Sequence, residues 1–238
     1  MNKFSENIYL PGGLHQFNHL NSNINPSVKD ILIIGSNSEK IGLKFLKSGC
    51  NTLNIIVDDQ DSLLISRLIL KDFSSVRNRM MNYESTDFNN DQFDIVYAQA
   101  SVSSPERNKI VKEIKRILKP GGIFSIGEIT SLREPAAQFI KDIWDNGNIF
   151  PLDHNNVSAY YLERGFDPID ELDLSDRLNE FYNMGKELLK KEKDSLTPIE
   201  KSSYKKLLNR ISHESNAYLK LGGKNYMGFK SLVLRKKI

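Results

Sequence analysis

The sequence has 238 residues, of which 39% are hydrophobic and 26% are charged, as in ordinary folded proteins and unlike disordered chains. Its formal net charge of +3 is too small to indicate a nucleic-acid partner, and we expect none. Cys50 is the single cysteine, which excludes an intramolecular disulfide and a cysteine-based metal site. Met1–Leu10 lacks the pattern of a secretory signal, and no apolar run approaches the roughly 20 residues of a membrane span. We therefore expect a cytoplasmic protein without a membrane partner.

Apolar runs alternate with helical patterns through the first two-thirds of the chain. Short runs of this kind are typical of parallel strands that helices cover on both faces. We expect strands at 31–34, 53–57, 76–83, 93–98 and 123–126. We expect helices at 38–46 and 63–70, and one whose apolar face is marked by Ile110, Ile114, Ile117 and Leu118. This alternation predicts a doubly wound, mostly parallel sheet.

The last third of the chain has a different composition. Residues 174–222 are rich in Lys and Glu and follow a helical pattern. The pattern breaks at 196–198, where Thr197 suits a helix cap and Pro198 suits the first turn of a second helix. A Gly-Gly pair ends that helix, and residues 229–234 predict a final strand. We interpret the helical pair as an insertion before this strand, with solvated charged faces.

One stretch carries a family resemblance. It opens with the strand Phe93-Asp94-Ile95-Val96, and its helix ends in Leu118-Lys119-Pro120-Gly121-Gly122 before the next strand. Pro120 suits the second position of a tight turn, and Gly121 can take the positive φ that follows in a type II turn. This order of strand, helix and turn resembles the class I S-adenosylmethionine-dependent methyltransferases. The resemblance is closest to the branch of ubiquinone- and menaquinone-biosynthesis and other small-molecule methyltransferases.

The resemblance covers most of the chain. Gly35 follows the first strand, Asp58 ends the second, and Gly165-Phe166 precedes the sixth, as in the family. Pro11-Gly12-Gly13-Leu14 is similar to an N-terminal segment of some members. The family fold is an α/β doubly wound, mostly parallel seven-stranded sheet of order 3-2-1-4-5-7-6, with the last strand antiparallel.

The resemblance also implies how the chain is organised. We expect one domain over residues 1–238, with the helical insertion at 174–222. Residues 1–29 are expected to cover the cleft, and residues 30–130 to form the cofactor-binding core.

The loop after the first strand departs from the family. Members have an acid at the end of this strand and then G-x-G-x-G, whose glycines let the backbone approach the cofactor. Here Gly35 is kept, whereas Asn37 and Glu39 replace the second and third glycines. Ile33 replaces the acid, which in the family helps to orient the cofactor's amino group. Asn tolerates left-handed backbone geometry, so we expect Asn37 to keep the turn.

The resemblance implies S-adenosylmethionine as the cofactor. Asp58 matches the acid that accepts hydrogen bonds from the ribose hydroxyls, and Asp59 is a second candidate. Glu84 matches an acid near the adenine amine, and Asn82 competes with it. Ligands of such sheets bind beyond the carboxyl ends of the strands. The cofactor-binding candidates are Gly35, Ser36, Asn37, Asp58, Asp59, Glu84, Ala98 and Gln99.

The sequence contains no pattern that assigns a catalytic role to one particular side chain. Methyl transfer from a sulfonium needs alignment above all, and a general base only where the acceptor must lose a proton. The candidates are His15, His154 and Tyr160, each with a packing or surface role as the alternative. Further side chains expected near the cleft are His19, Glu128, Trp144 and Tyr161. We expect no metal site, because no two histidines stand at ligand spacing with a nearby acid.

Two functions stay open at this point. The first is methyl transfer from S-adenosylmethionine to a small-molecule acceptor. The alternative is a catalytically silent relative with a binding or partner-subunit role, and a homo-oligomer is compatible with either. A protein or RNA methyltransferase ranks behind both, because Ala98-Gln99-Ala100-Ser101 does not match the N-P-P-Y-type motif after strand four.

Overall fold

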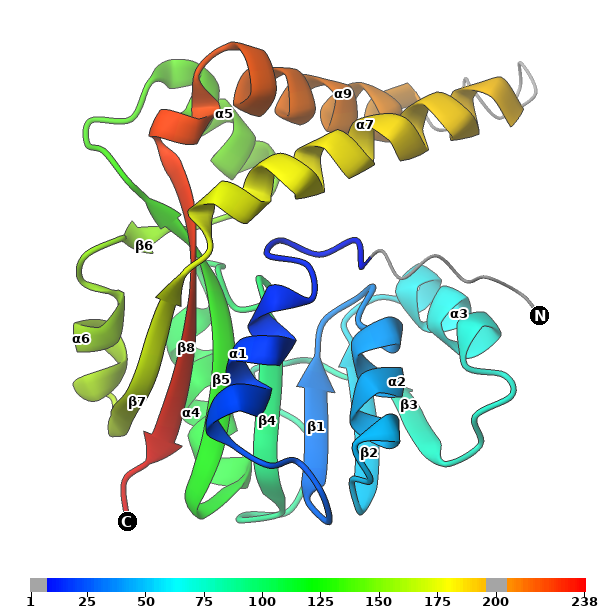
Figure 1. Cartoon of the computed structure of the whole chain (residues 1–238), viewed down its shortest axis with the longest axis vertical. Helices are drawn as coiled ribbons and strands as arrows, with labels where there is room; N and C mark the ends of the chain where they lie inside the picture. Colours follow the sequence, from blue (N-terminus) through cyan, green and yellow to red (C-terminus); the bar gives the residue numbers. More distant parts are fainter. Residues whose placement is uncertain (1–7, 196–204) are drawn as a thin grey trace.

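The computed structural model describes residues 8–195 and 205–238, and its elements follow the predicted alternation (Figure 1). The strands are β1 (Asp30–Ile34), β2 (Thr52–Val57), β3 (Val76–Met80), β4 (Phe93–Gln99), β5 (Leu118–Ser131), β6 (Leu152–Asp153), β7 (Phe166–Asp173) and β8 (Met227–Lys236). The α-helices are α1 (His15–Asn23), α2 (Glu39–Lys47), α3 (Gln60–Ile69), α4 (Arg107–Ile117), α5 (Gln138–Asn146), α6 (Val157–Leu162), α7 (Leu178–Ser195) and α9 (Lys205–Lys220). Short 3-10 helices are η1 (Ser175–Arg177) and η2 (Gly223–Asn225).

Eight strands of the described residues form one sheet. Its path is β3-β2-β1-β4-β5-β8-β7, and β6 pairs with β5 beside this path. Counted without β6, this is the predicted order 3-2-1-4-5-7-6. The strands run parallel except β8, which is antiparallel to both β5 and β7. The sequence prediction missed β6, because a strand of two residues shows no periodicity.

The central strands β1, β2 and β4 are buried on both faces, which explains their nearly continuous apolar runs. In β1, Ile31 and Ile33 pack with Phe45 of α2 on one face. Leu32 and Ile34 pack on the other face, in the cluster that contains the apolar side of α4. Since successive side chains of a strand point to opposite faces, a strand covered on both sides must be apolar at every position.

The turn that carried the family resemblance has the predicted geometry. Gly121 has a φ of 72°, in the left-handed region. The turn lies inside β5, where the register shifts so that Phe93 pairs with Leu118 and Ile95 with Ile123. The extra residues of β5 are therefore accommodated by a local departure from the ladder with β4.

Two helices differ from the expectations. Helix α1, which begins at His15, is not among the helices expected from the sequence. In α3, Leu63 and Leu70 pack inward, whereas Leu64, Ile65, Leu68 and Ile69 are exposed. A helix thus lies in the predicted range 63–70, but four of the six apolar residues of that range do not pack on the sheet.

The insertion before β8 forms a helical pair above the carboxyl ends of the strands (Figure 1). Tyr182 of α7 stacks on Tyr218 of α9, with ring centroids 4.4 Å apart. Tyr9 stacks on Phe181 of α7 at 4.9 Å, which joins the N-terminal segment to the insertion. The predicted break at 196–198, with Thr197 and Pro198, lies outside the described residues.

Glu128 of β5 is a buried structural carboxylate, not a group facing the cleft as we expected. Its side chain is fully buried and pairs with Arg107 of α4, with Nε and Oε1 2.9 Å apart. The hydroxyls of Ser103 and Tyr161 also donate hydrogen bonds to it. Arg107 additionally donates to the carbonyl of Phe150. This network joins β5, α4 and α6.

We predict that Arg107→Met strongly destabilises the fold, because it leaves the Glu128 charge buried without its cation. The free energy of unfolding should fall by about 3–5 kcal/mol, measured by urea denaturation. Arg177→Met is the control, because the Arg177–Glu180 pair is 45% and 59% exposed. That control should cost below about 1 kcal/mol. Equal losses in the two variants would contradict the structural role of the network.

Candidate functional site

The loop after β1 is built on a close approach of two backbones. Gly35 has a φ of 123°, and a Cβ placed on it would lie 2.7 Å from the Cβ of Ser101, just past β4. Ser101 donates a hydrogen bond to the carbonyl of Ile34 at 2.6 Å. Ser38 closes the loop by donating to the carbonyl of Gly35 at 2.6 Å. Only glycine fits at position 35 without displacing Ser101.

Asn37 keeps the turn that the lost glycine would have made. Its φ is 61°, in the left-handed region that Asn tolerates better than most residues. The chain then enters α2 at Glu39. The loop therefore retains a glycine-like path with one glycine.

A cavity of about 450 Å³, here called the strand-end cavity, lies at the carboxyl ends of β2, β3 and β4. Two of the predicted cofactor residues, Asp58 and Glu84, line it, together with Asn82. Its other lining residues are Met80, Met81, Tyr83, Ser101, Ser104, Glu106, Ile110 and Asn148. The structure thus brings the acid after β2 and the acid after β3 to one hollow, which adjoins Gly35 through Ser101.

Asp58 is exposed and is oriented by one tyrosine. The Tyr83 hydroxyl donates to Asp58 Oδ1 at 3.3 Å. Burial, and then the charge of Asp58, raise the pKa of Tyr83 far above its usual range, so this hydroxyl stays a donor. The second Asp58 oxygen accepts no hydrogen bond from the described part of the chain, which leaves acceptor capacity toward the cavity.

Asn82 and Glu84, which follow β3, both line the strand-end cavity. Glu84 forms an ion pair with Lys109 of α4, with Nζ and Oε2 3.1 Å apart. Asn82 accepts the backbone N–H of Glu84 at 2.8 Å. Both therefore have internal partners as well as a side toward the strand-end cavity.

Asp59 and Ser36 have local structural roles. Asp59 is the N-cap of α3 and accepts the backbone N–H of Ser62 at 2.8 Å. Hydrogen bonds from the Ser62 side chain and then its backbone hold the pKa of Asp59 below the usual range. Ser36 donates to the Ser62 hydroxyl at 2.9 Å. Neither residue lines the strand-end cavity.

Ala98 and Gln99 hold the N-terminal segment. The Ala98 carbonyl accepts from the side chain of Gln16 at 3.0 Å. Gln99 donates to the carbonyls of Pro11 and Gly13 at 2.6 and 2.8 Å. The side chain of Gln99 thus fixes the segment that leads to Tyr9.

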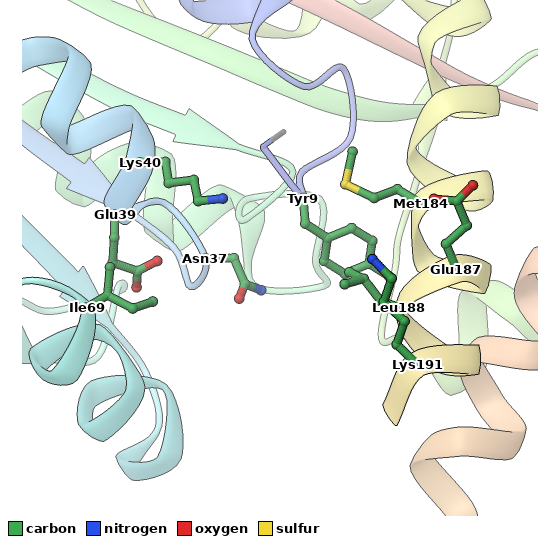
Figure 2. A pocket seen from close by; sticks show the side chains of 9 residues that line it. All are labelled: Tyr9, Asn37, Glu39, Lys40, Ile69, Met184, Glu187, Leu188 and Lys191. Atoms are coloured by element: carbon green, nitrogen blue, oxygen red, sulfur yellow. The ribbon is translucent and has the colours of Figure 1, made fainter. Parts of the chain in front are cut away.

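A second cavity, of about 270 Å³, lies between the start of α2, the end of α3 and α7; we call it the helix-facing cavity. Asn37, Glu39 and Lys40 line one side of it, and Tyr9 stands between this side and α7 (Figure 2). The other lining residues are Ile69, Met184, Glu187, Leu188 and Lys191. Asn37 of the loop after β1 lines this cavity, whereas Ser101, which lies against Gly35, lines the strand-end cavity.

The catalytic candidates lie at neither cavity. His154 contacts Thr130 at 2.9 Å and Asp173 at 3.2 Å. Tyr160 donates to Asn108 at 2.6 Å, and Arg164 lies over its ring. His15 is half-buried at the first turn of α1.

Of the further side chains, His19 contacts Ser231 at 2.9 Å and Asp170 at 3.1 Å. Tyr161 is buried and Trp144 packs in the core below the insertion. Within residues 8–195 and 205–238, no group of three or more His, Cys, Asp or Glu side chains is placed to hold a metal ion. None of the helices in that same part of the chain is long and apolar enough to cross a membrane.

Sequence reasoning missed several lining residues. Tyr9 had no signal, because a single aromatic residue ahead of a Pro-Gly-Gly segment has no pattern. The α7 residues Met184 and Leu188 stand four apart on one helical face, which reads equally as packing surface. Glu39 was identified only as the replacement of the family's third loop glycine, and no role was predicted for its carboxylate.

Comparison with known proteins places these features in context. Residues 45–126 match the family model described as a methyltransferase domain. A stretch of 106 residues is 34% identical to the sterol 24-C-methyltransferase erg6 of Aspergillus fumigatus, covering 44% of this chain and 25% of that protein. The chain therefore spans about a quarter of the curated relative that it matches.

Solved structures share the fold at low identity. A phosphoethanolamine N-methyltransferase 2 of Haemonchus contortus, in complex with S-adenosyl-L-methionine, is 14% identical with a TM-score of 0.76 over 99% of this chain and 55% of that one. The [4+2]-cyclase SpnF is 17% identical with a TM-score of 0.76 over 94% and 80%. A geranyl diphosphate C-methyltransferase of Streptomyces coelicolor is 10% identical with a TM-score of 0.68 over 93% and 76%.

The Gly35–Ser101 contact generates a stability prediction. Gly35→Ala combines a positive φ with a clash, whereas Gly121→Ala has a positive φ but no atom within 4 Å of the new Cβ. Gly121→Ala should cost about 1 kcal/mol from backbone strain, and Gly35→Ala about 2 kcal/mol more from overpacking. Urea denaturation of both variants measures the difference. If the two losses were equal, the close approach of Gly35 to Ser101 would be disproved.

Proposed function

We propose that the chain is a class I S-adenosylmethionine-dependent methyltransferase that transfers the methyl group to a small-molecule acceptor. The match of residues 45–126 to a methyltransferase domain and the 34% identity to a sterol methyltransferase over 106 residues support this proposal. This proposal rests mainly on the strand-end cavity. Asp58 and Glu84 both line this cavity, and it adjoins Gly35 through Ser101. Ligands of doubly wound sheets bind at this edge. The small-molecule acceptor agrees with the substrates named for the neighbouring structures, such as geranyl diphosphate. The single cysteine agrees with a cytoplasmic location.

The residues of the strand-end cavity fit a nucleoside. Asp58 has an oxygen open to the cavity, and a carboxylate is a suitable acceptor for the two hydroxyls of a ribose. Asn82 and Glu84 would lie toward the base, and Ile110 and Met81 supply apolar walls for it. Bound there, S-adenosylmethionine supplies an electrophilic methyl group on a sulfonium.

In this proposal the chain's own residues mainly position the two reactants and contribute little acid–base chemistry. Gln99 fixes the N-terminal segment, and Tyr9 stacks on Phe181, so that segment and insertion close over the strand ends together. A covered site aligns two reactants and excludes water, which is the main requirement of a sulfonium displacement. His15, His154 and Tyr160 are proposed as bases only for acceptors that must lose a proton. None of the three lines either cavity, which favours packing roles for them.

The alternative is a silent relative that binds a metabolite or a partner subunit. Two of three loop glycines are replaced, and Ser101 lies close against the one that remains. A neighbour with the same fold is named as a [4+2]-cyclase, so the fold alone does not fix the reaction. Binding of the cofactor, followed by turnover, separates the two functions.

The experiment is calorimetric titration with S-adenosylmethionine and S-adenosylhomocysteine. We predict that both bind the wild-type protein and that Asp58→Asn lowers the affinity about tenfold or more, because hydrogen bonds to a charged acceptor are lost. Asp59→Ala is the matched control. It should lower the free energy of unfolding by about 1 kcal/mol through loss of the α3 cap and leave the affinity within about twofold.

Two results would contradict the proposal. Absence of binding to the wild-type protein at millimolar ligand would leave only the silent alternative. An Asp58→Asn variant that is folded and binds as tightly as the wild type would remove Asp58 from the site.

A further inference from the structure

Helix α3 presents an apolar face to solvent. Four of its aliphatic side chains are between 42% and 70% exposed: Leu64, Ile65, Leu68 and Ile69. The helix lies at the end of the sheet where β3 is the edge strand (Figure 1). Monomeric proteins rarely leave a contiguous group of large aliphatic side chains in water, and such groups mark interaction sites. This face therefore calls for a partner.

Charged side chains stand at both ends of the apolar face. Asp61, Leu64, Leu68 and Lys71 are spaced three, four and three residues apart, which places them on one side of a helix. Lys71 directly follows Leu70, the C-cap of α3. In the part of the chain that the structure describes, the exposed side chains of Asp61 and Lys71 form no hydrogen bond or ion pair. The order along the face is acid, leucine, leucine, base.

This order is complementary to itself in reverse. In two copies of α3 that pack antiparallel about a twofold axis level with Ser66, Asp61 of each copy faces Lys71 of the other. In the same register Leu64 faces Leu68, because both pairs are centred on position 66. One register thus satisfies the charges and the leucines together. A twofold axis repeats each contact twice and closes the assembly as a dimer.

A lipid surface matches the face less well. Helices that lie in a membrane surface carry basic residues along an apolar face. Here Asp61 lies on the same side of α3 as Leu64 and Leu68, and Asp72 follows Lys71. Anionic headgroups repel these carboxylates, and removing the carboxylates from water without a counter-charge is costly. A second copy of the chain supplies the counter-charge for Asp61, whereas a lipid surface does not.

We propose that α3 is the centre of a homodimer interface, in which the helices of two copies pack antiparallel through Leu64 and Leu68. Reciprocal ion pairs between Asp61 and Lys71 close the two ends of the contact. Ile69 extends the apolar face and also lines the helix-facing cavity, so the second copy lies at the border of that cavity. One helix is a small contact surface, so we expect a weak dimer with a micromolar dissociation constant.

Sedimentation equilibrium of the full chain, from micromolar to millimolar protein, measures this dimer. Leu68→Glu should raise the dissociation constant about thirtyfold or more, because a central apolar contact is lost twice in each dimer. Leu221→Glu is the matched control, since Leu221 is 60% exposed and follows α9 rather than α3. The control should leave the dissociation constant within about twofold of wild type. Thermal melts establish that each variant is folded.

Reversing the charges tests the register of the two helices. Asp61→Lys and Lys71→Asp each bring like charges together, so each should raise the dissociation constant about tenfold. The variant with both changes again places opposite charges across the twofold axis. Its dissociation constant should return to within about threefold of wild type. These measurements are made at low ionic strength, where exposed charges are least screened.

Three results would overturn the inference. The first is a wild-type protein that stays monomeric at millimolar concentration, or a dimer that Leu68→Glu leaves intact. The second is a double charge variant that dimerises no more tightly than either single variant, because the antiparallel register would then be wrong. The third comes from flotation with phosphatidylcholine–phosphatidylserine vesicles: binding that Leu68→Glu abolishes would assign the face to a membrane. Absence of vesicle binding agrees with the dimer.

Discussion

The approach of the β1 end to the β4 end, where Gly35 lies against Ser101, constrains the edge of the sheet at which we propose that the ligand binds. A Cβ at position 35 would lie 2.7 Å from the Ser101 Cβ, so this contact requires glycine. The hydrogen bond from Ser101 to the Ile34 carbonyl holds the two strand ends together. Asn37 of this loop lines the helix-facing cavity, and Ser101 lines the strand-end cavity.

The sheet could be predicted because its physical causes are local. Strands buried on both faces must be apolar at every position, and the runs at β1, β2, β4 and β5 show this directly. The turn at Gly121 could be predicted from its residues, because Pro followed by Gly favours a turn with a positive φ at the glycine. In contrast, β6 is too short for a pattern, and the outward aliphatic side chains of α3 follow from tertiary packing that periodicity does not encode.

The site could be predicted only in part, for a related reason. Asp58 and Glu84 follow strands, so the topology alone brings them to one edge. The partners of Gln99, Glu128 and His154 come from elements far away in the sequence, and no local pattern reveals them. Helix α7 contributes its part of the helix-facing cavity through the packing of the insertion above the sheet (Figure 1). Loop residues that depart from a family pattern therefore need the structure before they can be interpreted.

The central claim is that a loop with one glycine still supports a cofactor across the ends of β1 and β4. The most direct measurement is a crystal structure of the protein with S-adenosylhomocysteine. The ribose hydroxyls should lie within hydrogen-bond distance, about 3 Å, of Asp58, and the amino-acid end should lie on the Asn37 side of the loop. A ligand bound elsewhere, or crystals that take up none at saturating concentration, would contradict the claim.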